Sequence, residues 1–216
     1  MKHLFKLTLL LLPLLLPATA TAYDFEVDGI YYIINGNEAT VTYGTEEYAG
    51  DVTIPEIVTY NGATYSVTSI GERSFQGCIS LTTINIPSTI NTIDVGAFED
   101  CGGLNTITIP YSVTTIGSAA FAGCGLITID IPNSVTSVGE SAFYGCSKLK
   151  SVTIGNSVTT IGHMVFQSCT SLTTIDIPNS VTSVGDQAFC YCSSLTSVTI
   201  PNSVTTIDWG AFYNCI

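Results

Sequence analysis

Cysteine is the reactive residue type that recurs most regularly in this chain. Seven of its eight cysteines stand three residues after a phenylalanine, and those phenylalanines are spaced 23, 23, 22, 23, 23 and 23 residues apart. The seven are Cys78, Cys101, Cys124, Cys146, Cys169, Cys192 and Cys215. No C-x-x-C pair or neighbouring histidine completes a zinc-binding set, and thiols stacked in one phase point in parallel and cannot all form disulfides. We therefore expect a ladder of small, reduced, buried thiols, without a metal or cofactor. Cys190 lies outside this ladder, and the sequence leaves open whether it is an exposed thiol or incidental variation.

His163 is the other candidate for chemistry, because it is the only histidine after residue 22. The equivalent position in the other repeats holds chemically unrelated residues, which favours a solvent-facing position for His163. These residues are Glu72, Val95, Ser118, Glu140, Asp186 and Trp209. No Ser-His-Asp or Cys-His grouping follows from the repeat. The sequence predicts no catalytic residues and no enzyme activity.

Carboxylates could hold a cation, and their densest group in the array is Asp94, Glu99 and Asp100. A Ca²⁺-binding loop has closer acidic spacing together with a glycine. We interpret these three residues as surface charge and predict no metal site.

The first 22 residues have the three-part pattern of a secretory signal peptide. Lys2 and Lys6 precede an apolar run over residues 7–16, and small residues over 18–22 offer a cleavage site. The apolar run is too short to span a bilayer, and no later segment is long enough. The sequence predicts a secreted or cell-surface protein with no membrane insertion after signal removal.

The remaining chain is strongly acidic. It carries 17 acidic residues against Arg73, Lys148 and Lys150, a formal net charge of −14. Such a charge repels nucleic acid, heparin-like polymers and anionic lipid, and it also keeps a protein soluble. Nucleic acid is excluded as a partner.

All these residues must be positioned by the repeat itself, which reads L-x-x-I-x-I-P-x-S-V-x-x-I-G-x-x-A-F-x-G-C. Within residues 104–109, Ile107 and Ile109 alternate with Thr108, and Pro110 ends the run, which predicts a short strand. Residues 113–116 predict a second strand, and residues 120–124 a tight turn or 3₁₀ piece. A single unit buries too little apolar surface to offset its ordering entropy. Neighbouring units must therefore stack into a β-rich solenoid with parallel strands.

The motif I-P-x-S-V-T-x-I-G-x-x-A-F-x-G-C resembles the BspA-like, or Treponema pallidum-type, leucine-rich repeats over roughly residues 52–216. The resemblance implies a leucine-rich-repeat solenoid and no catalytic residues. It also implies a bacterial surface or secreted protein used in adhesion to host proteins or other cells.

The two ends of the chain differ from the array. Residues 23–70 predict an N-terminal β cap, in which Asn61-Gly62 marks a hairpin turn. Residues 71–216 form the repeat array, which stops in mid-repeat at Ile216. Because arrays need capping repeats, we expect a truncated product.

The outward face of the main strand is the best binding candidate. Its central column is Asn85, Thr108, Asp130, Thr153, Asp176 and Thr199, and its second column is Thr83, Thr106, Thr128, Ser151, Thr174 and Ser197. Short polar side chains stacked at ~4.8 Å give a flat, stiff surface that suits an extended protein or glycan. Thr and Ser are also simply good solvent-facing strand residues. No aromatic stripe on this face marks a sugar platform.

We therefore expect an exported adhesion or protein-binding module whose partner is an extracellular protein or glycan. The alternative is a structural spacer repeat of a larger surface protein, with no ligand of its own.

Overall fold

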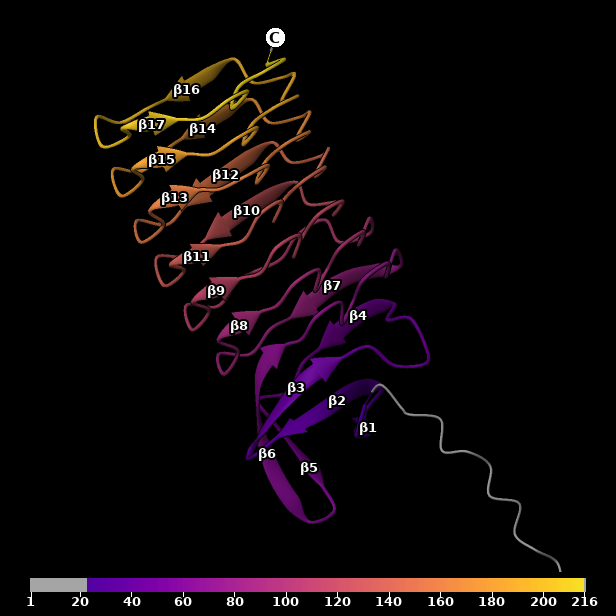
Figure 1. Ribbon diagram of the computed structural model, residues 1–216. Coiled ribbons are helices and arrows are strands. Elements are labelled where there is room, and N and C mark those ends of the chain that lie inside the picture. The colour runs from indigo at the N-terminus through magenta and orange to yellow at the C-terminus, as the bar shows by residue number, and fades with distance from the viewer. Residues whose placement is uncertain (1–22, 216) are drawn as a thin grey trace, which may run out of the picture.

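The computed structural model describes residues 23–215, which fold into strands joined by turns, with no helix among them. The strands form a small N-terminal sheet from which a column of stacked coils rises to the C-terminal end (Figure 1). The predicted β-rich solenoid with parallel strands and an N-terminal β-hairpin is thereby confirmed. Residues 1–22, predicted to be the signal peptide, lie outside the described residues.

The N-terminal sheet is antiparallel where it begins and parallel where it meets the array. Strands β1 (Phe25–Val27), β2 (Ile30–Asn35) and β3 (Glu38–Thr42) follow one another as antiparallel neighbours. Strands β5 (Ile57–Tyr60) and β6 (Ala63–Ile70) form the hairpin, with Asn61 and Gly62 at φ of 51° and 80°. Because β6 pairs in parallel with both β3 and β8, the cap continues directly into the first coil.

Each coil contributes one strand to each of two stacks, except the coil that begins at residue 104, which contributes only to the second. The main stack consists of β4 (Gly50–Thr53), β7 (Leu81–Asn85), β10 (Thr128–Ile131), β12 (Ser151–Ile154), β14 (Thr174–Asp176) and β16 (Ser197–Thr199). The second stack consists of β8 (Thr92–Ile93), β9 (Thr115–Ile116), β11 (Ser137–Val138), β13 (Thr160–Ile161), β15 (Ser183–Val184) and β17 (Thr206–Ile207). Paired strands are parallel and join equivalent positions of successive repeats, as with Thr128 opposite Ser151.

The strand predicted over residues 104–109 is not part of a regular ladder. Its side chains alternate as expected, with Ile107 and Ile109 buried and Thr108 exposed, but its backbone is not assigned as a strand. The gap adjoins the one 22-residue repeat, where the backbone at Gly125 lies against the Gly102 carbonyl and leaves no space for a Cβ. The shortened connection therefore coincides with a local break in the main stack.

The core is a stack of phenylalanine rings that runs the length of the array. Successive rings lie 5.0–5.5 Å apart and within 14° of parallel, a favourable aromatic arrangement. The rings belong to Phe75, Phe98, Phe121, Phe143, Phe166, Phe189 and Phe212. At the N-terminal end, Tyr48 continues the stack, 4.5 Å from Phe75.

The residues around each phenylalanine form the predicted tight turn, which we call the turn segment. Successive backbone N–H groups there donate in turn to a carbonyl of their own repeat and to a carbonyl of the next repeat. Ala122 donates to Ala119 O at 3.0 Å, whereas Phe121 donates to Ala142 O at 2.8 Å. The alternation satisfies the backbone while holding adjacent coils together.

Buried thiols form a ladder beside the ring stack. Each of six cysteines donates from Sγ to the carbonyl of a phenylalanine in the preceding repeat, at 2.9–3.3 Å. All eight cysteines are free, as expected for a reduced ladder. Cys190 is also buried, at 3% exposure, so the option of an exposed thiol at that position is wrong.

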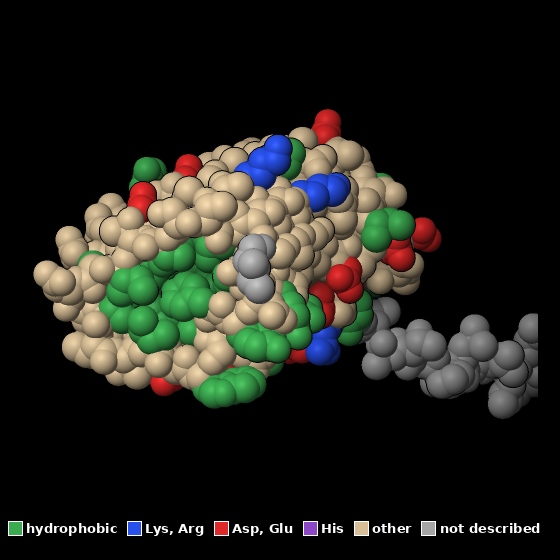
Figure 2. Space-filling view, turned by 90° about the horizontal axis from the view of Figure 1, so that it is seen from above, with side chains coloured by type: hydrophobic (Ala, Val, Ile, Leu, Met, Phe, Trp, Pro, Cys, Tyr) green, Lys and Arg blue, Asp and Glu red, His purple; other side chains and the backbone are tan. Residues whose placement is uncertain are grey.

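The last coil leaves apolar side chains partly uncovered. Val198, Val204 and Phe212 are only partly buried, and Ile207 is 48% exposed. Figure 2, which looks down on this end, shows hydrophobic side chains gathered in its middle and charged side chains toward the edges.

Candidate binding surface

The main stack carries the predicted polar surface, which we call the strand face. All twelve residues of its two predicted columns are exposed. The central column is Asn85, Thr108, Asp130, Thr153, Asp176 and Thr199, and the second is Thr83, Thr106, Thr128, Ser151, Thr174 and Ser197. The pattern follows from the strand period of two, which turns Ile129 and Val152 into the core and their neighbours toward solvent.

Strand pairing brings these side chains into rows. Asp130 lies opposite Thr153 and Asp176 opposite Thr199, in parallel register. Thr53 of β4 lies opposite Asn85, so the central column extends into the N-terminal part of the chain. Ladder spacing of ~4.8 Å between strands makes the surface rigid and repetitive.

Hydroxyl groups on the strand face differ from those elsewhere in the coil. Along the coil edges, threonine hydroxyls donate to a backbone carbonyl of the preceding repeat, as Thr182 does to Thr159 O at 3.2 Å. Thr114, Thr136, Thr173, Thr196 and Thr205 make the same kind of bond. Within residues 23–215, the hydroxyls of Thr108, Thr153 and Thr199 have no such partner. Their donors and acceptors remain available to a ligand.

At its N-terminal end the strand face meets an acidic cavity. Asp51 Oδ1 accepts hydrogen bonds from Thr82 and Thr83 at 2.8 and 2.7 Å, and these bonds lower the pKa of the Asp51 carboxyl. The cavity has a volume of about 280 Å³. Its lining includes Asp28, Glu46, Glu47, Asp51 and Tyr48. The Tyr48 hydroxyl is held by donating to Thr42 O at 2.7 Å and accepting from Tyr31 N at 3.1 Å.

Charge on the strand face is mainly negative. Asp130 and Asp176 lie in its central column, and Lys150 is exposed beside it. The face therefore favours a partner that brings basic groups.

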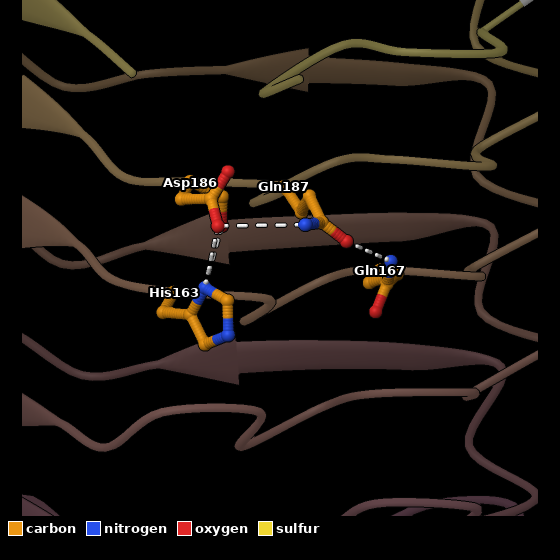
Figure 3. Close-up of polar contacts among 4 residues, drawn as sticks. All are labelled: His163, Gln167, Asp186 and Gln187. Carbon is orange, nitrogen blue, oxygen red and sulfur yellow. Dashed lines mark hydrogen bonds and ion pairs between the residues drawn. The ribbon is translucent and has the colours of Figure 1, made fainter. Parts of the chain in front are cut away.

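His163 lies on the turn segment rather than on the strand face. Its side chain is 37% exposed, and its Nδ1 lies 3.3 Å from Asp186 Oδ2 and 3.1 Å from the Asp186 carbonyl oxygen. Gln187 Nε2 donates to Asp186 Oδ2 at 3.4 Å, and Gln167 Nε2 donates to Gln187 Oε1 at 3.0 Å (Figure 3). The position is at the surface, as expected, but it is bonded to a neighbour rather than freely solvated.

This polar network was not predicted from the sequence. The repeat did hold the signal for it, because His163 and Asp186 are 23 residues apart and therefore stack. The amide contacts depend on side-chain conformations, which spacing does not specify.

The carboxylates Asp94, Glu99 and Asp100 do not come together as a site. Asp94 Oδ1 accepts from the Val95 amide at 3.0 Å, and Glu99 Oε2 accepts from Gln76 Nε2 at 2.6 Å. Across residues 23–215, no three or more His, Cys, Asp and Glu side chains are grouped to hold a metal ion. The same residues include no helix long and apolar enough to cross a membrane.

Comparisons with known proteins agree with this geometry. The family model for the BspA-type leucine-rich repeat region matches residues 59–128 and 114–216, with six copies. None of the curated proteins matches the chain.

Solved bacterial leucine-rich-repeat proteins are similar to this chain. One from Bacteroides ovatus is 31% identical, with a TM-score of 0.70 over 86% of this chain and 56% of its own. The pneumococcal vaccine antigen PcpA is 25% identical, with a TM-score of 0.67 over 83% of this chain and 50% of its own. The T. pallidum leucine-rich-repeat protein, at 24% identity and a TM-score of 0.63 over 84% of this chain and 91% of its own, shares the fold. The chain thus spans about half the length of the first two proteins.

Proposed function

This chain belongs to the BspA-type leucine-rich repeat family, and on that premise we propose that it is an exported binding module whose strand face holds an extended segment of an extracellular protein. Leucine-rich repeats are typically a protein-interaction fold rather than a catalytic one. Export is supported by the signal-peptide pattern of residues 1–22.

One observation carries this proposal. The strand face presents hydroxyl, amide and carboxylate groups that are exposed at a fixed spacing and, in the central column from Thr108 to Thr199, have no internal hydrogen-bond partner among the described residues. Short side chains lose little rotamer entropy on binding, so a rigid ladder of them suits an extended polypeptide. The carboxylates Asp130 and Asp176, with the acidic cavity beyond Asp51, favour a segment that contains Lys or Arg.

Binding of residues 23–216 to immobilised extracellular-matrix proteins tests this function. The variant Thr108→Lys, Asp130→Lys, Thr153→Lys reverses the charge of the strand face without touching the core. We expect this variant to lose binding, because lysine side chains crowd the ladder and repel a basic segment. Binding by the wild type should also weaken as salt concentration rises, because salt screens exposed charges.

A matched control adds the same charge elsewhere. Asn179→Lys, Asn202→Lys, Asp208→Lys changes exposed residues outside the strand face and should leave binding unchanged. Equal loss in both variants would indicate a non-specific effect of net charge. A folded wild type that binds none of the proteins would favour the spacer function instead.

A further inference from the structure

A second exposed surface lies on the turn segments of the later repeats. Four aromatic side chains there are exposed to solvent: Tyr144 by 43%, Tyr191 by 48%, Trp209 by 76% and Tyr213 by 56%. Tyr144 and Tyr191 lie between a strand of the second stack and the next strand of the main stack, whereas Trp209 and Tyr213 follow β17, the last strand. We call these residues, with the half-buried Gln187, the turn surface.

Contacts within the turn surface fix its geometry. The rings of Tyr191 and Tyr213 meet edge to face, with centroids 5.9 Å apart and planes at 86°. A Cβ built on Gly210 would lie 3.4 Å from Gln187 Cγ and 3.9 Å from Tyr213 Cβ, so these two side chains flank the glycine. Gln187 and Tyr213, from successive coils, are therefore neighbours on this surface.

The side-chain amide of Gln187 is already oriented by its neighbours. Gln167 is only 6% exposed, and its Nε2 donates to Gln187 Oε1, while Gln187 Nε2 donates to the Asp186 carboxylate (Figure 3). Asp186 is further held by His163 Nδ1 at 3.3 Å. Trp209 stands one repeat beyond Asp186, and its carbonyl oxygen accepts from the Gln187 backbone N–H at 3.1 Å. This backbone bond places Trp209 in the coil next to Gln187.

The same positions have different chemistry in the first repeats. There the turn segments carry Arg73, Gln76, Glu99 and Asp100, of which Arg73 pairs with Glu72 and Gln76 donates to Glu99. The equivalent positions later in the chain hold Tyr144, Gln167, Gln187, Tyr191 and Tyr213. The array therefore changes from a charged to an aromatic and amide surface, although the packing repeat stays the same.

From these contacts we propose that the turn surface binds a neutral glycan chain. Tyrosine and tryptophan rings offer flat apolar faces for the C–H faces of sugar rings, and they carry a polar atom at the edge. Beyond its bonds to Gln167 and Asp186, the half-buried Gln187 amide keeps one N–H and one oxygen lone pair for sugar hydroxyls. Tyr144 and Tyr213 are three repeats apart, about 14 Å at ~4.8 Å per strand spacing, which suits an oligosaccharide rather than a single sugar.

Charge and shape narrow the choice of ligand. The described chain is acidic and this surface includes no Lys or Arg, so an anionic glycan is disfavoured. A protein partner would favour a contiguous apolar patch, whereas these rings come from three coils and, among the described residues, only Tyr191 and Tyr213 are in ring contact. The surface is distinct from the strand face, so it stands independently of the proposed function.

The test uses residues 23–216 and four soluble neutral polysaccharides: an α-glucan, a β-glucan, a galactan and a mannan. Affinity electrophoresis measures how strongly a polysaccharide in the gel slows the protein. Fluorescence reports directly on Trp209, the only tryptophan of the chain. We expect at least one polysaccharide to retard the protein and to shift or quench its fluorescence. The double variant Tyr191→Ala, Tyr213→Ala should weaken that binding by about tenfold or more, because two stacking faces are removed.

Two further variants distinguish the loss of ring stacking from a loss of folding and from non-specific binding. Tyr191→Phe, Tyr213→Phe keeps both rings and should retain most of the binding. Tyr111→Ala removes an 82% exposed tyrosine that lies outside the turn surface, and should change nothing. The proposal is overturned if none of the four polysaccharides binds, if Tyr111→Ala weakens binding equally, or if only an immobilised protein is bound through Tyr191 and Tyr213.

Discussion

At the scale of single residues, the turn segment requires two unusual backbone conformations in every repeat. The positions two before and two after each phenylalanine have positive φ, from 52° at Arg73 to 73° at Gly77. Glycine adopts this region without a steric penalty, whereas other residues meet a clash between Cβ and the carbonyl oxygen. Ser168, Tyr191 and Asn214 occupy it nevertheless, so interactions between coils must stabilise the turn enough to offset that penalty.

Two glycines isolate this backbone effect. A Cβ on either Gly77 or Gly102 would meet no atom within 4 Å, but only Gly77 has positive φ, at 73°. Gly77→Ala should lower the free energy of unfolding by about 1–2 kcal/mol, the usual cost of a left-handed non-glycine residue. Gly102→Ala should leave it unchanged or raise it slightly, because alanine restricts the unfolded chain. Urea denaturation of both variants measures this, and equal losses would show that φ is not the cause.

Thiol ionisation gives a second prediction at this scale. Burial raises the pKa of Cys78 to about 11 and those of Cys146 and Cys192 to about 12, from an ordinary value of 9. A thiol whose pKa is raised by folding stabilises the folded state at pH values below its unfolded-state pKa. That stabilisation is lost as the pH rises toward the folded-state pKa. The melting temperature should therefore fall between about pH 9 and 12, with a smaller fall in Cys146→Ala. A pH-independent melting temperature over that range would contradict this account.

At the scale of the repeat element, the phenylalanine stack is the main contact between coils. Phe121→Ala removes a ring with no exposure that lies 5.3 Å from the rings on either side, and should cost about 3–5 kcal/mol of unfolding free energy. Phe212→Ala removes a partly exposed ring at the last coil and should cost clearly less. Thermal or urea unfolding compares the two, and a similar cost at both positions would argue against an additive stack of rings.

Much of this element could be predicted from the sequence because its determinants are local. The alternation around Ile107 and the fixed distance from each phenylalanine to its cysteine specify which side chains are buried, and the structure confirms both. The ladder gap at residues 104–109 could not be predicted, since strand pairing depends on how adjacent coils stack and the side-chain pattern there is the same as in the other repeats. The turn surface was missed for a similar reason, because its aromatic residues come from different repeats and meet only after stacking.

At the scale of the whole molecule, the array has contacts only between neighbouring coils. Phe143, for example, stacks on Phe121 and Phe166, and its carbonyl accepts the Cys169 thiol of the next coil at 3.3 Å. A structure built this way has a stability that is roughly the sum of repeat and interface contributions, and it opens from its weaker parts. The strand face and the turn surface are each made of side chains from several coils. Local opening of one coil therefore disrupts part of each surface.

The last coil should therefore open more readily than the middle of the array. Ile207 is 48% exposed, whereas the equivalent Val184 and Ile161 are 0% and 2% exposed, so the last coil buries less apolar surface. In hydrogen exchange measured by mass spectrometry, peptides from residues 196–215 should exchange fastest within the array, and those from 113–172 slowest. Because Trp209 and Tyr213 lie in this coil, a glycan bound at the turn surface should slow exchange there more than elsewhere. Uniform protection along the array in the free protein would show that it unfolds as one cooperative unit, and the independent opening of the last coil would then be wrong.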